Sequence, residues 1–200
     1  MQEQAVTWGG TSYPLDLPFF VLATQNPIEQ SGTYPLPEAQ LDRFLLHIRV
    51  DYPAEAEERE ILARTTGAAR PRASAVISAA EILQAQALVR DVRLADPLLD
   101  YVTRLVRASR PVGSPLAPVR ELVRWGAGPR AGQALILAAK ARAILEGRFA
   151  VTLADLRAVA PPVFRHRILV NYRAEAEGVT ADDITARLLA SVPEPPALLR

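Results

Sequence analysis

Several chemically distinctive residue types are absent or scarce in this chain, and each absence excludes a class of function. There is no cysteine, which excludes disulfides, thiolate nucleophiles and cysteine-based zinc sites. Histidine occurs only as His47 and His166, and neither stands at a spacing from carboxylates that predicts a metal site. We interpret both histidines as structural residues.

Lysine is almost as scarce. Lys140 is the one lysine among 23 basic residues, so the other 22 are arginine. A phosphate-binding P-loop needs Gly-Lys followed by Ser or Thr, because the lysine reaches the terminal phosphates and the hydroxyl binds magnesium. Lys140 has an alanine on each side. The 200-residue sequence therefore contains no P-loop.

Long apolar runs and excess charge are also missing. No apolar stretch approaches the ~18 residues that would cross a bilayer, and the amino terminus has no signal-peptide core. The formal net charge of +1 gives no overall attraction to nucleic acid. Half of the residues are apolar, which is enough for a sizeable core. These features predict a cytoplasmic protein without membrane insertion.

The first quarter of the chain carries strand signals. Gly9-Gly10, between two short alternating runs, is typical of a two-residue hairpin turn. Residues 17–23 form a continuous apolar run, which predicts a strand buried on both faces of a parallel sheet. A short helix over 37–44 and a second strand over 45–50 follow.

Helix signals dominate from residue 53 onward, so we place a domain boundary between residues 52 and 53. Helices are expected from Pro53 to about Thr66 and from Arg130 to Glu146, each followed by a glycine. Four further starts, capped by Ser78, Asp96, Thr152 and Thr180, predict helices near 79–90, 97–109, 153–160 and 181–190. Residues 110–129 are rich in proline and glycine and are predicted as a loop, and 193–200 as a flexible tail.

Three residues are candidates for chemistry, each with an ordinary alternative. Asn26 follows the apolar run 17–23, at the end of the predicted strand. Open parallel sheets bind ligands beyond the carboxyl ends of their strands, but Asn-Pro also starts turns. Arg43 could be a cation presented after a short helix, or a surface partner of Asp42 or Glu38. Arg130, in a first helical turn, opposes the helix dipole, which suggests a nearby anion, either a carboxylate or a ligand phosphate.

A basic stretch, Arg165-His166-Arg167, could contact nucleic acid. No aromatic residues accompany it in a stacking pattern, and the net charge is near zero. We therefore interpret it as solvated surface.

Two blocks together resemble the MoxR family of AAA+ ATPases. The first runs through residues 19–30 (FFVLATQNPIEQ) and 32–44 (GTYPLPEAQLDRF). The second, residues 126–131 (GAGPRA), is similar to the family's sensor-2 signature, with Gly128 in place of the usual serine. The resemblance implies an α/β remnant of an AAA+ P-loop core over 1–52, consisting of a hairpin and two strands of the parallel sheet. An all-α lid domain over 53–192 would follow it.

The resemblance also implies roles. Asn26 would be sensor 1, orienting the attacking water, and Arg43 the arginine finger, acting on the nucleotide of an adjacent subunit. Arg130 would be sensor 2, in cis or in trans. Because Gly128 replaces the usual serine, the helix that begins near Arg130 would lack a capping hydroxyl at its start.

By family, the function would be ATP-driven remodelling or maturation of partner proteins by a chaperone-like homo-oligomer, with a hexameric ring expected. ATP and Mg²⁺ would be the cofactors of the full-length protein, and a protein with a von Willebrand factor A domain a possible partner. Because the P-loop lies upstream in relatives, Met1 would be an internal methionine, and this chain alone would not bind nucleotide tightly or hydrolyse ATP. The alternatives are a non-enzymatic interaction module built on the helical lid, or a nucleic-acid-binding AAA+ relative.

Overall fold

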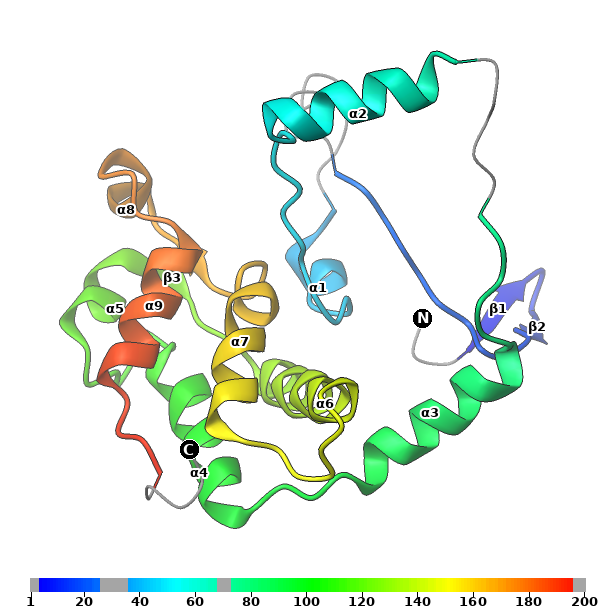
Figure 1. Ribbon diagram of the computed structural model, residues 1–200. Helices are drawn as coiled ribbons and strands as arrows, with labels where there is room; N and C mark the ends of the chain where they lie inside the picture. Colours follow the sequence, from blue (N-terminus) through cyan, green and yellow to red (C-terminus); the bar gives the residue numbers. More distant parts are fainter. Residues whose placement is uncertain (1–3, 26–35, 68–72, 196–200) are drawn as a thin grey trace.

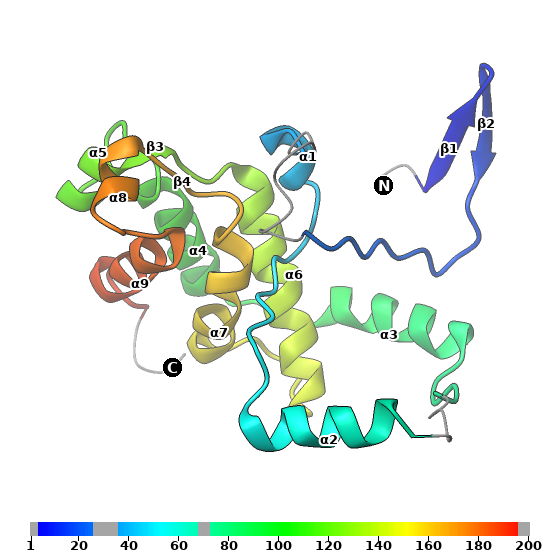
Figure 2. The same ribbon diagram turned by 90° about the horizontal axis from the view of Figure 1, so that it is seen from above.

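The computed structural model of the protein describes residues 4–25, 36–67 and 73–195 (Figure 1). The chain begins with an antiparallel hairpin of β1 (Ala5–Trp8) and β2 (Thr11–Pro14), in which Val6 faces Tyr13. Gly9 and Gly10 form its turn with φ angles of 58° and 81°, which glycine adopts without strain. The predicted hairpin is confirmed. It extends away from the helical part of the molecule (Figure 2).

The two predicted parallel strands are not formed, so this part of the expected fold is wrong. Residues 17–23 and 45–50 contain no strand, and within the described residues neither segment has a partner strand. Phe20 is 81% exposed and Val50 is 92% exposed. The reason is physical: an apolar run becomes a strand only where neighbouring backbone takes up its N–H and C=O groups.

Helices make up most of the rest. After α1 (Glu38–Leu41), which is shorter than predicted, come α2 (Glu55–Thr65) and α3 (Ala79–Asp91). Neither α2 nor α3 contributes a buried residue. Both predicted helices are nevertheless present, and Ser78 caps α3 by accepting a hydrogen bond from the Glu81 amide.

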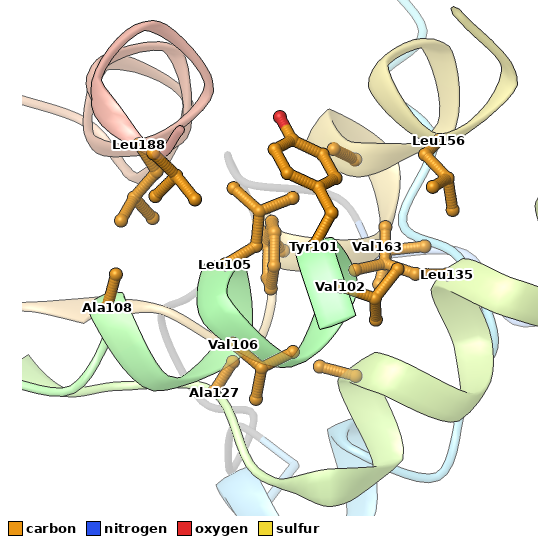
Figure 3. Close-up of a cluster of buried hydrophobic side chains, with 14 of the residues drawn as sticks. Tyr101, Val102, Leu105, Val106, Ala108, Ala127, Leu135, Leu156, Val163 and Leu188 are labelled. Carbon is orange, nitrogen blue, oxygen red and sulfur yellow. The ribbon is translucent and has the colours of Figure 1, made fainter. Parts of the chain in front are cut away.

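The hydrophobic core lies between Val92 and Val192. It is built by α4 (Asp96–Ala108), α6 (Pro129–Leu145), α7 (Leu153–Phe164) and α9 (Ala181–Ser191). Figure 3 shows Tyr101 and Leu105 of α4 among side chains from α6, α7 and α9. The predicted helix over 130–146 is confirmed as α6, which has six buried residues and packs against α4 and α7.

The helix boundaries show three corrections. Ala95, not Asp96, is the N-cap of α4, and Asp96 is the first helical residue. The predicted loop 110–129 instead contains α5 (Ala117–Leu122) and β3 (Val123–Trp125). The third is that α7 continues to Phe164, beyond the expected end near residue 160.

Tertiary pairing explains the missed elements. Strand β3 pairs antiparallel with β4 (Leu169–Val170), and Asn171 caps α8 (Tyr172–Ala176) by accepting from the Ala174 amide. Pro118 is tolerated because it stands in the first turn of α5, where its missing N–H costs no helical hydrogen bond. A three-residue strand has no periodicity to detect, and only the pairing of Val123 with Val170 and of Trp125 with Leu169, 47 and 44 positions later, makes it a strand.

Candidate functional site

Arg43 follows directly after the end of α1. Its amide donates to the Gln40 carbonyl at 3.2 Å, which fixes the backbone, while its side chain is exposed. Among the described residues, none forms a hydrogen bond or ion pair with the Arg43 side chain. The ordinary alternative for Arg43 is therefore wrong, because Glu38 pairs with Arg124 and Asp42 pairs elsewhere. The Arg43 guanidinium is therefore exposed to solvent.

Asp42 holds two arginines at once. Its Oδ1 accepts from Nε of Arg167 at 2.9 Å, and its Oδ2 lies 3.4 Å from Nη1 of Arg130. Arg130 is in the first turn of α6, so this contact joins the end of α1 to the start of the central helix. Of the two anions that the sequence left open for Arg130, a carboxylate is the one found here.

The two ion pairs differ in strength. The Arg167 side chain is 3% exposed, whereas the side chains of Arg130 and Asp42 are 40% and 30% exposed. A half-exposed pair at 3.4 Å contributes at most about 1 kcal/mol. Asp42 is thus fixed firmly by Arg167 and holds Arg130 loosely.

Arg167 satisfies a set of backbone carbonyls. Its Nη1 donates to Leu45 and Val163 at 3.1 and 2.8 Å, and its Nη2 donates to Asp42 and Phe44 at 3.0 and 2.6 Å. Burial lowers the pKa of Arg167, although hydrogen bonding to Asp42 opposes the shift. An arginine keeps its charge in such surroundings, so the guanidinium stays a five-way donor.

Arg165 and His166, the two residues before Arg167, also contact backbone carbonyls of the segment after α1. Arg165 donates from Nη1 to the His47 carbonyl at 2.6 Å and from Nε to Asp182 at 3.0 Å. Nε2 of His166 lies 3.1 Å from the Phe44 carbonyl oxygen, and the His47 amide donates to the Pro162 carbonyl at 2.8 Å. We call Arg165, His166 and Arg167 the arginine clamp, because together they tie residues 42–47 to the end of α7.

The clamp corrects the interpretation of this stretch as solvated surface. His166 is 9% exposed, and burial and the charge of Arg167 lower its pKa to about 4, so it is neutral at physiological pH. The structural interpretation of His166 agrees with this position. Nothing in the sequence pattern distinguishes these residues from surface arginines, because their acceptors are backbone carbonyls more than 100 positions away.

The remaining predicted site residue, Asn26, lies outside the described residues, as does most of the predicted tail. In the part of the chain that the structure describes, no group of three or more His, Asp or Glu residues could hold a metal ion. Over the same residues, no helix is both long and apolar enough to cross a membrane. The candidate site therefore consists of Arg43, Asp42 and Arg130, with Arg167 behind them. Sequence reasoning missed Asp42 and Arg167 as parts of it.

Comparisons with known proteins match both the segment that carries Arg43 and the helical segment that carries Arg130. The family model for the ATPase family associated with various cellular activities (AAA) matches residues 1–46, and the AAA lid domain model matches residues 117–188. "Chaperone MoxR1" of Mycobacterium tuberculosis is 42% identical over 196 residues, which cover 98% of this chain and 52% of that protein. "Protein MoxR" of Paracoccus denitrificans is 37% identical, over 88% of this chain and 56% of that protein.

A solved structure has the same fold. The crystal structure of a candidate ATPase from Cytophaga hutchinsonii superimposes with a TM-score of 0.89 at 39% identity, over 96% of this chain and 59% of that one. The chain thus spans slightly more than half the length of these relatives. From the two family models, the MoxR-named relatives and this structural neighbour, we conclude that the chain belongs to the MoxR family of AAA+ ATPases and corresponds to the carboxyl-terminal part of its members.

Proposed function

We propose that this chain supplies the arginine finger, both sensors and the lid to an ATP-hydrolysing MoxR-type ring that remodels or matures partner proteins. Arg43 is the finger, Arg130 is sensor 2, and Asn26 is sensor 1. Residues 1–52 then belong to the ATPase core and 53–192 to the lid. ATP and Mg²⁺ would be bound mainly by residues of a P-loop segment, which this sequence does not contain.

The carrying observation is that Arg43 is exposed and unengaged within the described residues, while the preceding residue, Asp42, pairs with a second arginine, Arg130. In phosphoryl transfer, negative charge develops on the γ-phosphate oxygens, and a preorganised guanidinium stabilises it. Within the described residues, the Arg43 side chain has no partner to give up before it reaches a phosphate. Its charge is therefore available at little cost.

Arg130 could act on the nucleotide of its own subunit (in cis) or on that of a neighbouring subunit (in trans), and its contact with Asp42 supports action in trans. Arg130 is ion-paired to Asp42, the residue that directly precedes Arg43, so the backbone segment that carries Arg43 also contacts the start of α6. A finger acts on the nucleotide of the adjacent subunit. We infer that Arg130 acts in trans on that same nucleotide, releasing its weak contact with Asp42 for the stronger one with phosphate.

The test uses a polypeptide in which a P-loop segment of the family precedes this chain. We expect Arg43→Ala to lower kcat by about 10³-fold, the lower end of what a finger contributes. Arg130→Ala and Asp42→Asn are expected to lower ATPase activity less, because they remove or misplace the second cation. Arg59→Ala on α2, an exposed arginine that is not part of the candidate site, is the matched control. Unchanged turnover in both Arg43→Ala and Arg130→Ala would instead favour an interaction module.

Subunit mixing separates cis from trans. Subunits carrying Arg130→Ala are mixed with subunits whose P-loop lysine is replaced by alanine, each inactive or impaired alone. Recovery of activity on mixing is expected if Arg130 reaches a neighbour's nucleotide, since the intact P-loop then receives its arginine from the other subunit. An absence of recovery, with recovery in the parallel Arg43→Ala mixture, would assign Arg130 to its own subunit's nucleotide.

The partner class and the location stay predictions of the family resemblance. A protein with a von Willebrand factor A domain, a hexameric ring and a cytoplasmic location are all compatible with this proposal. Nucleic acid is the less favoured partner, because the chain has balanced charge.

A further inference from the structure

A second arginine-rich surface shares no residue with the candidate site. The carboxyl-terminal half of α4, the loop after it, the start of α5 and the end of α9 enclose a groove of about 960 Å³ that is open to solvent. We call it the α4/α9 groove. Figure 1 shows the end of α9 coming down beside α4.

The groove is positively charged. Four arginines line it, namely Arg104, Arg107, Arg110 and Arg187, and none of the described lining residues carries a carboxylate. Arg104 donates from Nη2 to the Pro193 carbonyl at 3.2 Å, and Arg110 donates from Nε to Ala127 at 3.1 Å, which leaves other N–H groups of each guanidinium. The side chains of Arg107 and Arg187 form no hydrogen bond or ion pair within the described residues.

Two carboxylates near the groove in sequence have hydrogen-bonding partners outside its lining. Glu194 pairs with Arg157, and Asp183 accepts from both the amide and the hydroxyl of Thr180 as part of the α9 cap. Asp183 also interacts electrostatically with Arg187, one turn later on α9, so the charge of Arg187 is partly compensated. The described lining itself holds four arginines and no carboxylate, so the groove keeps an excess of positive charge. An anionic partner would gain several charge-assisted contacts there.

The other described residues of the lining are mostly apolar, and none of them carries an aromatic ring. Val112 is 93% exposed, and Pro115, Leu116 and Pro118 continue the apolar wall. We propose that the α4/α9 groove binds an acidic peptide segment of a partner protein, with its carboxylates on the four arginines and its apolar side chains against this wall.

The chemistry of the lining favours a peptide over nucleic acid. Single-stranded nucleic acid is usually bound by stacking its bases on aromatic side chains, and the groove offers none. An open groove also encloses a small ligand poorly, whereas an extended peptide covers it along its length. This proposal does not depend on the ATPase roles of Arg43 and Arg130.

The test measures binding to the 200-residue chain itself. Fluorescence anisotropy follows a labelled peptide that repeats Glu-Glu-Leu, with a Lys-Lys-Leu peptide and a labelled oligo-dT as comparison probes. We expect the acidic peptide to bind, more weakly as salt is raised, and the double variant Arg107→Glu/Arg187→Glu to weaken it by at least about tenfold. The control Arg59→Glu/Arg90→Glu makes the same change of charge outside the groove and should leave most of the affinity.

Each other outcome overturns the proposal. It fails if the acidic peptide does not bind, if both double variants weaken it equally, or if oligo-dT binds more tightly and is lost in the groove variant. Arg107→Gln/Arg187→Gln, which removes charge without reversing it, gives an intermediate loss if the site is correct. Unchanged circular dichroism of each variant shows that the fold is retained.

Discussion

At the residue scale, Asp42 connects two arginines that are far apart in the sequence, Arg130 and Arg167. One carboxylate oxygen is bound to the buried Arg167 and the other to the half-exposed Arg130, so the same side chain has a firm contact and an exchangeable one. The neighbouring Arg43 is carried on the same short backbone segment. A carboxylate that the sequence presents as an ordinary surface charge thus links the segment after α1 to the start of α6 and to the residue that follows α7 by three positions.

His166 gives a pH-dependent prediction at this scale. Its ring faces Phe44, Arg167, His47 and Asp42, and burial and the charge of Arg167 lower its pKa from 6.5 to about 4. Between these pH values the unfolded chain binds a proton that the folded chain does not. The free energy of unfolding therefore falls as pH is lowered through this window, because protonation favours the unfolded state.

The measurement is urea unfolding at about pH 7 and about pH 5. His166→Gln keeps an N–H donor for the Phe44 carbonyl but does not titrate, so it should lose about 1 kcal/mol less stability than the natural chain between these conditions. An equal loss in both proteins would show that other groups carry the acid sensitivity.

At the element scale, two glycines at the start of α6 differ in whether the structure has room for a side chain: Gly126 has none, and Gly128 has open space. A Cβ on Gly126 would lie 2.4 Å from the Ser109 carbonyl oxygen and 2.5 Å from Cα of Arg110, whereas Gly128 has open space around it. Gly128 is the N-cap of α6, with no side-chain hydrogen bond to its amides. The expected effect of the missing serine hydroxyl is therefore visible as an unfilled capping position.

This contrast predicts opposite changes in thermal stability. Gly126→Ala forces a backbone shift and should lower the free energy of unfolding by about 2 kcal/mol. Gly128→Ser supplies a capping oxygen and should raise it by a few tenths of a kcal/mol. Differential scanning calorimetry of both variants checks the prediction, and a fall in melting temperature for Gly128→Ser would contradict the capping argument.

At the scale of the whole molecule, the arginine clamp joins the segment after α1 to the helical unit. Arg167 provides five of its donor contacts, and no other described element holds Phe44 and Leu45 by side-chain hydrogen bonds. In the ATPase proposed above, this clamp fixes how Arg43 is placed relative to the lid. A change of lid position would then move the finger with it.

Replacing Arg167 by methionine should release that segment. Met keeps much of the volume but leaves the Leu45 carbonyl without its arginine donor, the Phe44 carbonyl with His166 Nε2 as its remaining described side-chain partner, and Asp42 without its buried partner, a loss of about 3 kcal/mol. Hydrogen exchange should show faster exchange over residues 42–47, including the His47 amide that donates to Pro162. Arg173→Met, which removes an exposed arginine paired with Glu177, is the matched control. Equal protection of residues 42–47 in both variants would contradict the clamp.

Local patterns in the sequence were sufficient for the hairpin, the capped helices and the family resemblance. Gly9-Gly10 specifies a tight turn by its backbone freedom, and Ser78, Thr152 and Thr180 specify helix starts by their own hydroxyls. These features depend on residues a few positions apart. They can therefore be read before any tertiary contact is known.

Only the tertiary structure decided the pairings between distant residues. The apolar runs 17–23 and 45–50 did not become strands because a strand depends on its neighbours, and β3 became one because β4 pairs with it. The roles of Asp42 and Arg167 likewise arise from acceptors and donors more than 100 positions apart. An arginine or aspartate is the same residue in the sequence whether it lies on the surface or in the clamp. Its function depends on its partners, and only folding brings those partners within 3 to 4 Å.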